Sequence, residues 1–225
     1  MKIRRYLMLV AACTFFLGKS IAANNEKPFV IPELQEWRGA QGMFTPSATS
    51  RIVWLGKDSA VARVANQFAE DYETMFGRKL AVVQGRASAG DFVFSLSGDR
   101  QLGEEGYAVR IADRVSISAP KAKGLYWATR TILQMTEQNS DQALPKGAVR
   151  DYPDYAIRGF MMDCGRKFIP MDFLRDYVKM MAYYKMNTFQ VHLNDNAFKQ
   201  YYEHDWNKTY SAFRLECETY PGLTA

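Results

Sequence analysis

Carboxylate and imidazole side chains follow two short apolar runs in the last third of the chain. Asp163 closes the run that begins at Ile157, and His192 and Asp195 follow the run that begins at Thr188. Such groups can exchange protons, accept hydrogen bonds from a substrate, or hold a metal ion. The alternative is that Asp163 and Asp195 are loop and cap residues with no part in chemistry.

A metal site is the less favoured use of these groups. Glu203, His204 and Asp205 lie downstream of His192 and Asp195, but their spacing matches no compact ligand motif. The sequence also contains no glycine-rich phosphate loop, no Gly-x-Ser-x-Gly elbow and no Cys-x-x-Cys pair. We therefore expect neither a metal nor a cofactor.

A helix must separate the two runs. Apolar residues recur at helical spacing between them: Phe173, Leu174, Tyr177, Val178, Met181 and Tyr184. Pro170 precedes this stripe, Asp172 suits the first turn, and Asn187 could take the left-handed conformation that closes a helix. A strand, a helix and a strand of these lengths form a parallel unit, whose functional groups gather at the carboxyl ends of the strands.

Residues 24–150 predict a small α+β domain with a mostly antiparallel sheet and two helices on one face. One helix is expected over 61–75 with Ser59 and Gly77 as its caps, and another over 122–138. Residues 107–118 alternate as a hairpin, and 139–146 read as a polar linker. The domain has no evident cluster of titratable groups, so its expected role is support. The second domain is expected over 151–225.

The first 22 residues resemble an export signal. Lys2, Arg4 and Arg5 precede an apolar segment over 6–18, and Ser20-Ile21-Ala22 suits a signal peptidase. The segment is too short for a convincing membrane span. We expect the protein to be exported from the cytoplasm and to be periplasmic or secreted. The alternative is a lipoprotein anchored through Cys13.

The net charge of +5 depends on this leader. Without its four basic residues, 29 − 4 = 25 basic side chains stand against 24 acidic ones, a net charge of +1. A nucleic-acid partner is therefore not expected. Cys164 and Cys217 remain after cleavage, and two buried thiols are favoured over a disulfide, although export would permit one.

Several motifs together resemble one enzyme family. They are Arg158-Gly159-Phe160-Met161-Met162-Asp163, Arg166-Lys167-Phe168-Ile169-Pro170, Lys185-Met186-Asn187 and His192-Leu193-Asn194-Asp195-Asn196. Upstream, Glu105-Gly106-Tyr107 and Gly124-Leu125-Tyr126-Trp127 agree with them. Residues 28–225 thus resemble the small domain and the start of the catalytic domain of family 20 glycoside hydrolases, the exo-β-N-acetylhexosaminidases.

The resemblance implies a (β/α)8 TIM barrel, incomplete in this chain, and a glycan substrate with terminal β-linked N-acetylglucosamine or N-acetylgalactosamine. It implies retention of configuration without an enzyme nucleophile, because the 2-acetamido oxygen of the sugar attacks the anomeric carbon. An Asp orients that group and the neighbouring Glu protonates the leaving oxygen.

The resemblance also assigns roles to four residues. Arg158 and Asp195 would bind the substrate, Arg158 through the sugar's 3- and 4-hydroxyls and Asp195 as a support residue of the active site. His192 and Asp163 would have supporting roles. Arg158 starts its strand, whereas barrel sites lie at strand ends, so its role depends on resemblance alone. The sequence departs from the family at Lys167, at Asn196 and over 199–212, which looks like an insertion.

No adjacent Asp-Glu pair follows Asp195, so the catalytic pair is expected beyond Ala225 and the isolated chain is expected to be inactive. Two alternatives stay open. The chain could be a non-catalytic glycan-binding remnant built on the small domain, or part of a different TIM-barrel glycosidase.

Overall fold

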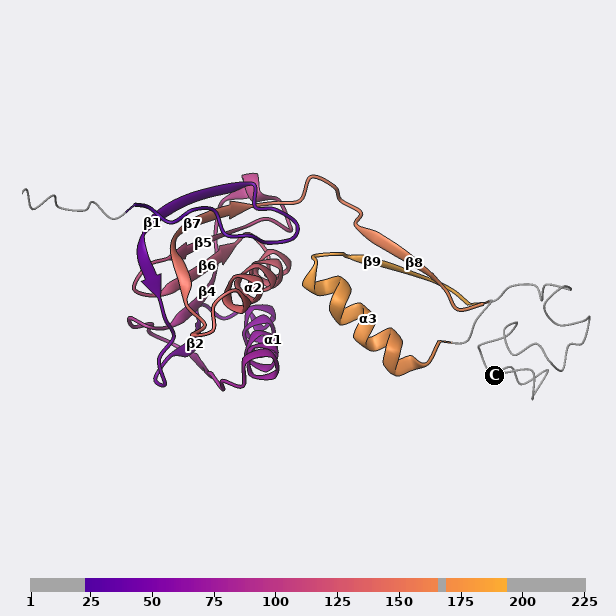
Figure 1. The fold of residues 1–225 in the computed structure, drawn as a ribbon, viewed down its shortest axis with the longest axis horizontal. Helices are drawn as coiled ribbons and strands as arrows, with labels where there is room; N and C mark the ends of the chain where they lie inside the picture. The colour runs from indigo at the N-terminus through magenta and orange to yellow at the C-terminus, as the bar shows by residue number, and fades with distance from the viewer. Residues whose placement is uncertain (1–22, 166–168, 194–225) are drawn as a thin grey trace, which may run out of the picture.

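A computed structural model describes residues 23–165 and 169–193. Two parts are evident: a sheet covered by two helices, and a smaller strand–helix–strand unit beside it (Figure 1). The strands of the first part are β1 (Glu36–Phe44), β2 (Arg51–Trp54), β3 (Ala81–Gln84), β4 (Phe92–Leu96), β5 (Tyr107–Ile111), β6 (Val115–Ala119) and β7 (Leu144–Asp151). Its helices are α1 (Ser59–Phe76), the short 3-10 helix η1 (Arg100–Leu102) and α2 (Ala122–Glu137).

The seven strands form one sheet in the order β1-β7-β5-β6-β4-β2-β3. Strand β2 pairs in parallel with β3 and β4, and β4 with β6, whereas β5 is antiparallel to β6 and β7, and β1 to β7. The α+β class and the hairpin of β5 and β6 are confirmed. The sheet itself is mixed, so the expectation of a mostly antiparallel sheet was wrong.

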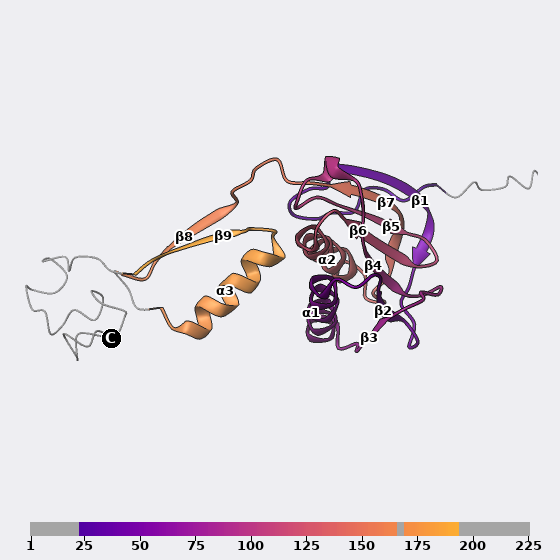
Figure 2. The same cartoon turned by 180° about the vertical axis from the view of Figure 1, so that it is seen from behind.

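Both long helices form where their apolar periodicity predicted them, and they lie side by side on one face of the sheet (Figures 1 and 2). Gly77 closes α1 in the left-handed conformation at φ 67°, as predicted. The amino-terminal cap is Asp58 rather than Ser59, because the Asp58 carboxylate accepts a 2.8 Å hydrogen bond from the Ala60 amide.

The core lies between this helical face and the sheet. Phe68 and Tyr72 of α1 are fully buried and meet Phe92 of β4 with ring centroids 5.5 and 5.8 Å away. The 16 residues of α2 carry twelve buried positions, so this helix runs through the centre of the domain. The first part therefore has a complete hydrophobic core of its own.

The second part contains β8 (Gly159–Asp163), α3 (Met171–Tyr183) and β9 (Thr188–His192). Strands β8 and β9 pair in parallel, which confirms the predicted strand–helix–strand unit. Tyr177 of α3 packs between Phe160 of β8 and Phe189 of β9, at centroid distances of 5.3 and 5.7 Å. One face of the two strands is thus covered.

Much apolar surface of the second part stays exposed. The large apolar residues concerned include Ile157, Phe160, Met161, Met171, Phe173, Val178 and Met180. Among the described residues, only β8 and β9 form this sheet, so each strand has one unpaired edge. No helix in the described ranges has the length and apolar character to cross a membrane.

Candidate functional site

The carboxyl ends of β8 and β9 bring Asp163 and His192 side by side. The register pairs these two residues directly, and the Cys164 amide extends the pairing by donating to the His192 carbonyl at 2.9 Å. The Asp163 carboxylate also accepts a 3.1 Å hydrogen bond from the Gly165 amide. Both side chains are half-buried, so this edge presents a carboxylate and an imidazole that a ligand could reach.

Other predicted groups at this edge lie outside the described residues, namely Asp195 and Asn196, as does Cys217. Cys164 is buried. Within residues 23–165 and 169–193, no group of three or more His, Cys, Asp or Glu side chains is arranged to hold a metal ion.

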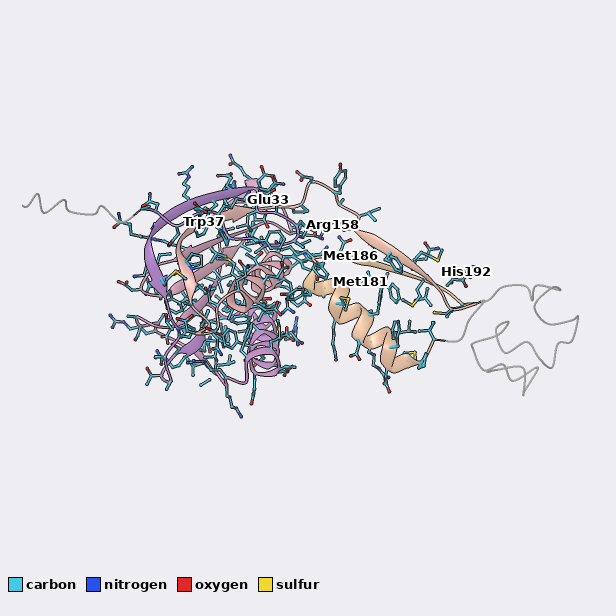
Figure 3. The ribbon with its side chains drawn as sticks, in the orientation of Figure 1. Glu33, Trp37, Arg158, Met181, Met186 and His192 are labelled. Carbon is cyan, nitrogen blue, oxygen red and sulfur yellow. The ribbon has the colours of Figure 1, made fainter. Side chains whose placement is uncertain are left out.

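Arg158 lies at the other end of the unit, just before β8 (Figure 3). Its Nε donates to the Lys185 carbonyl and its Nη1 to the Tyr155 carbonyl, each at 2.7 Å. Its Nη2 forms an ion pair with Glu105 of the small domain, and the guanidinium lies 5.6 Å from the Trp127 ring centroid. All three guanidinium nitrogens therefore have partners within the protein, and His192 marks the distant end of β9 in Figure 3.

The turn between α3 and β9 differs from the prediction. Lys185, not Asn187, takes the left-handed conformation, at φ 58°. Asn187 instead links the two strand beginnings, because its Oδ1 accepts the Arg158 amide at 2.9 Å. Its Nδ2 donates to the Ala156 carbonyl at 2.8 Å and to Glu105 at 3.2 Å. The prediction of Asn187 as the helix-closing residue was therefore wrong: Asn187 connects the beginnings of β8 and β9.

Lys185 enters the small domain as a buried cation. Its Nζ donates to the Tyr107 hydroxyl at 2.8 Å and to the Asp151 carboxylate at 3.0 Å, and its side chain is only 8% exposed. Tyr107 also donates to Asp151 and contacts the Thr131 hydroxyl at 2.5 Å. Burial lowers the pKa of Lys185 despite the nearby Asp151, and raises that of Tyr107.

Six residues thus form one polar cluster, called here the junction network: Glu105, Tyr107, Asp151, Arg158, Lys185 and Asn187. A cavity of about 230 Å³ adjoins five of them, with Trp127, Tyr155 and two prolines among its other walls. Sequence reasoning missed Glu105, Lys185 and Asn187 as interacting residues. Their only signal was membership of the two motifs that carried the family resemblance.

A parallel strand–helix–strand unit is the repeating element of a (β/α)8 barrel, and here it follows a small domain whose sheet is covered by two helices. Comparison with known families agrees. The family description "Glycosyl hydrolase family 20, domain 2" matches residues 27–152, and "Glycosyl hydrolase family 20, catalytic domain" matches residues 155–225. The chain belongs to glycoside hydrolase family 20.

Similar proteins bear hexosaminidase names. A beta-hexosaminidase of Porphyromonas gingivalis is 27% identical over 171 residues, which is 72% of this chain and 20% of that protein. A beta-N-acetylhexosaminidase of Cellulomonas fimi is 36% identical over 104 residues, covering 45% of this chain and 21% of the relative. The chain therefore spans about a fifth of the length of these relatives.

Solved structures share the fold. A mutant Streptomyces plicatus beta-hexosaminidase, in complex with its product GlcNAc, aligns with a TM-score of 0.73 at 23% identity. The alignment covers 90% of this chain and 39% of that one. The beta-N-acetylhexosaminidase of Streptomyces coelicolor gives a TM-score of 0.72 at 22% identity with the same coverage.

Proposed function

We propose that the protein carrying this chain hydrolyses terminal, non-reducing β-linked N-acetylhexosamine residues from glycans. The observation that carries the proposal is the pairing of Asp163 with His192 at the carboxyl ends of β8 and β9, inside the stretch that matches the family's catalytic domain. Catalytic groups of barrel enzymes lie at this end of the strands. The hexosaminidase names of the relatives give the substrate class.

The proposed reaction retains configuration and uses the sugar's 2-acetamido oxygen as the nucleophile. That oxygen bonds to the anomeric carbon as the glycosidic bond breaks, and a general acid protonates the departing oxygen. Water then opens the cyclic intermediate. In this scheme Asp163 and His192 hold neighbouring groups in place by hydrogen bonding, and Asp195 contacts the substrate. An Asp-Glu pair orients the acetamido group and supplies the proton; no adjacent pair of this kind follows Asp195 in this sequence.

The sugar-binding role of Arg158 stays a prediction. The contacts of its guanidinium with Glu105, Lys185 and Tyr155 support a place at the junction network instead. Export is likewise proposed from the leader alone; mass spectrometry of the protein recovered from the periplasm or medium would show whether residues 1–22 have been removed.

The test compares two proteins with a chromogenic β-N-acetylglucosaminide. One is the 225-residue chain, and the other is the product of any open reading frame that continues past Ala225 with an Asp-Glu pair. We expect turnover by the longer product only, with retention visible by NMR of the released sugar. The matching glucoside, which has no acetamido group, is the control and should not be cleaved.

Two results would contradict the proposal in different ways. Turnover by the 225-residue chain would show that the reacting groups lie within it. Equal cleavage of the glucoside by the longer product would remove the acetamido group from the mechanism and favour a different glycosidase.

A further inference from the structure

Residues from four of the motifs that carry the family resemblance meet in space at the junction, at the opposite end of the strands from Asp163 and His192. Glu105 and Tyr107 belong to one motif of the small domain, and Trp127 to another. Arg158, Lys185 and Asn187 come from two motifs of the second part, and each donates a hydrogen bond to Glu105 or Tyr107. Residues from both parts of the chain are therefore matched to one another.

We propose that Glu105 is a positioning residue: by holding Arg158 and Asn187, it fixes the beginnings of β8 and β9 on the small domain and so sets where Asp163 and His192 lie. The small domain would then influence catalysis, and this part of the proposal rests on the proposed function. Glu105 itself touches no substrate in this scheme.

Glu105 is suited to this role by its partners and its burial. One carboxylate oxygen accepts from Lys123 and from Asn187, and the other from Arg158. The side chain is only 10% exposed, so these charged hydrogen bonds act with little competition from water. Burial favours the neutral acid, yet the three donors outweigh it and lower the pKa of Glu105.

The loop that carries Glu105 is itself firmly seated. A Cβ on Gly124, in the first turn of α2, would lie 2.2 Å from the Gly106 carbonyl oxygen, so only glycine permits this approach. A Cβ on Gly106 would lie 2.2 Å from the Leu102 carbonyl oxygen. Loop and helix are thus in direct backbone contact, and α2 brings Lys123 and Trp127 to the same place.

A second set of contacts fixes the end of α3 and the turn that follows it to the small domain. Lys185 joins Asp151 and Tyr107, while the α2 side chain of Gln134 donates to the Tyr183 carbonyl at 2.8 Å. The start of β8, the start of β9 and the end of α3 are therefore each fixed to the small domain, whereas the described strand ends point away from it (Figure 3).

Fixing the strand beginnings matters because errors grow along the strands. A strand of five residues is roughly 15 Å long. A tilt of about 10° at its base would therefore move its far end by roughly 2–3 Å. Displacement of catalytic groups by about 1 Å can slow an enzyme on the order of 100-fold.

The first experiment uses the 225-residue chain and does not depend on activity. Hydrogen exchange is measured by mass spectrometry for Glu105→Ala, Glu105→Gln and the control Glu104→Ala, whose exposed side chain precedes Glu105. We expect Glu105→Ala to speed exchange at least 10-fold in β8 and β9 with little change in β5 and β6. Glu105→Gln keeps an acceptor for Asn187, so exchange in β8 and β9 should speed up less than in Glu105→Ala.

A variant from the other side of the contact guards against unfolding of the small domain. Arg158→Ala removes the same ion pair without altering that domain, and should speed exchange in β8 and β9 alone. A double-mutant cycle then tests whether the two substitutions act through one contact, in which case the double variant resembles Glu105→Ala. Unchanged exchange in both single variants would overturn the proposal.

The second experiment uses the product of an open reading frame that continues past Ala225, as in the test of the proposed function. We expect Glu105→Ala to lower kcat at least 10-fold while KM changes less than about 3-fold, with partial recovery in Glu105→Gln and no effect of Glu104→Ala. A rise in KM alone for Arg158→Ala would instead support its role as a sugar ligand and contradict the positioning role. If the parent protein cleaves no N-acetylhexosaminide, the proposed function fails while the exchange experiment still decides the junction.

Discussion

At the scale of single residues, Arg158 and Lys185 belong to the strand–helix–strand unit, but their charged groups bind side chains of the small domain. Arg158 uses its planar fork to reach three acceptors in different directions, which a lysine could not do. Lys185 is buried beside Asp151, where removal of either partner would leave an unpaired charge. Neither environment can be inferred from composition, because each includes a charged partner more than 30 residues away in the sequence.

The carboxyl group of Glu105 makes the junction sensitive to acid. Its folded-state pKa lies below the ordinary value of 4.5, so its contribution is fully present above that value and is lost as the pH falls through the lowered one. We expect the free energy of unfolding of the second part to fall more steeply below pH 4.5 in the parent than in Glu105→Gln. Urea denaturation at several pH values between about 3 and 6 measures this.

Asp91 also has a lowered pKa, held down chiefly by Arg51 against the effect of burial, and it will add an acid dependence of its own. That dependence belongs to the small domain and is common to parent and variant. The difference between the two proteins therefore isolates Glu105, and parallel pH profiles would show that its carboxylate does not stabilise the junction.

At the scale of elements, the sequence pattern predicted the helices and strands whose formation depends on neighbouring residues in the chain. The apolar periodicity located α1, α2 and α3, and alternation located the hairpin of β5 and β6. Strand β7 was mistaken for a linker over its first residues because Leu-Pro-Lys-Gly has neither alternation nor β propensity. It is a strand because β1 and β5 supply its hydrogen-bond partners, Glu36 opposite Arg150 and Tyr107 opposite Asp151.

The candidate site was predictable only in part. Asp163 and His192 could be placed together, since parallel strands end at one edge, and the register bears this out. The junction network could not be foreseen. Its contacts join Glu105 to Arg158 and Tyr107 to Lys185 across the two parts, and no periodicity reports on pairing of that kind.

Gly124 offers a test of how closely α2 meets the loop of Gly106. Alanine is normally the better helix former by about 1 kcal/mol. Here its Cβ would lie 2.2 Å from the Gly106 carbonyl oxygen, and such overpacking costs about 1–3 kcal/mol. We expect Gly124→Ala to lower the free energy of unfolding of the small domain, as measured by urea denaturation.

Gly98→Ala is the matched control, because a Cβ there meets nothing within 4 Å. It should leave stability nearly unchanged. A Gly124→Ala protein as stable as the parent would mean that helix and loop can separate at little cost, which would also weaken the case for a firmly seated Glu105.

At the scale of the molecule, the two parts differ in what holds them together. The small domain has its own core, with Phe68, Tyr72 and Phe92 fully buried. The second part has two strands, exposed apolar side chains such as Phe173 and Met180, and a junction formed largely by polar contacts. A sheet of two strands is marginal without further packing.

We therefore expect the 225-residue chain to unfold in two steps. Urea should first remove protection from hydrogen exchange in β8, α3 and β9, and only at higher concentration in β4 and β6. Phe68→Ala is the reciprocal control, since it should destabilise the small domain by about 3–5 kcal/mol. Simultaneous loss of protection throughout the described residues would show that the junction unites both parts into one cooperative unit.

The order of the junction residues along the chain also has a consequence in time. Glu105 precedes Arg158 by 53 residues, an interval of about 3–10 s at ordinary rates of synthesis. Amino-terminal domains generally fold as they leave the ribosome. Glu105 and Tyr107 would then already be in place when Arg158 emerges, followed by Lys185 and Asn187. The folded small domain would therefore be present for β8 and β9 to dock on as they form.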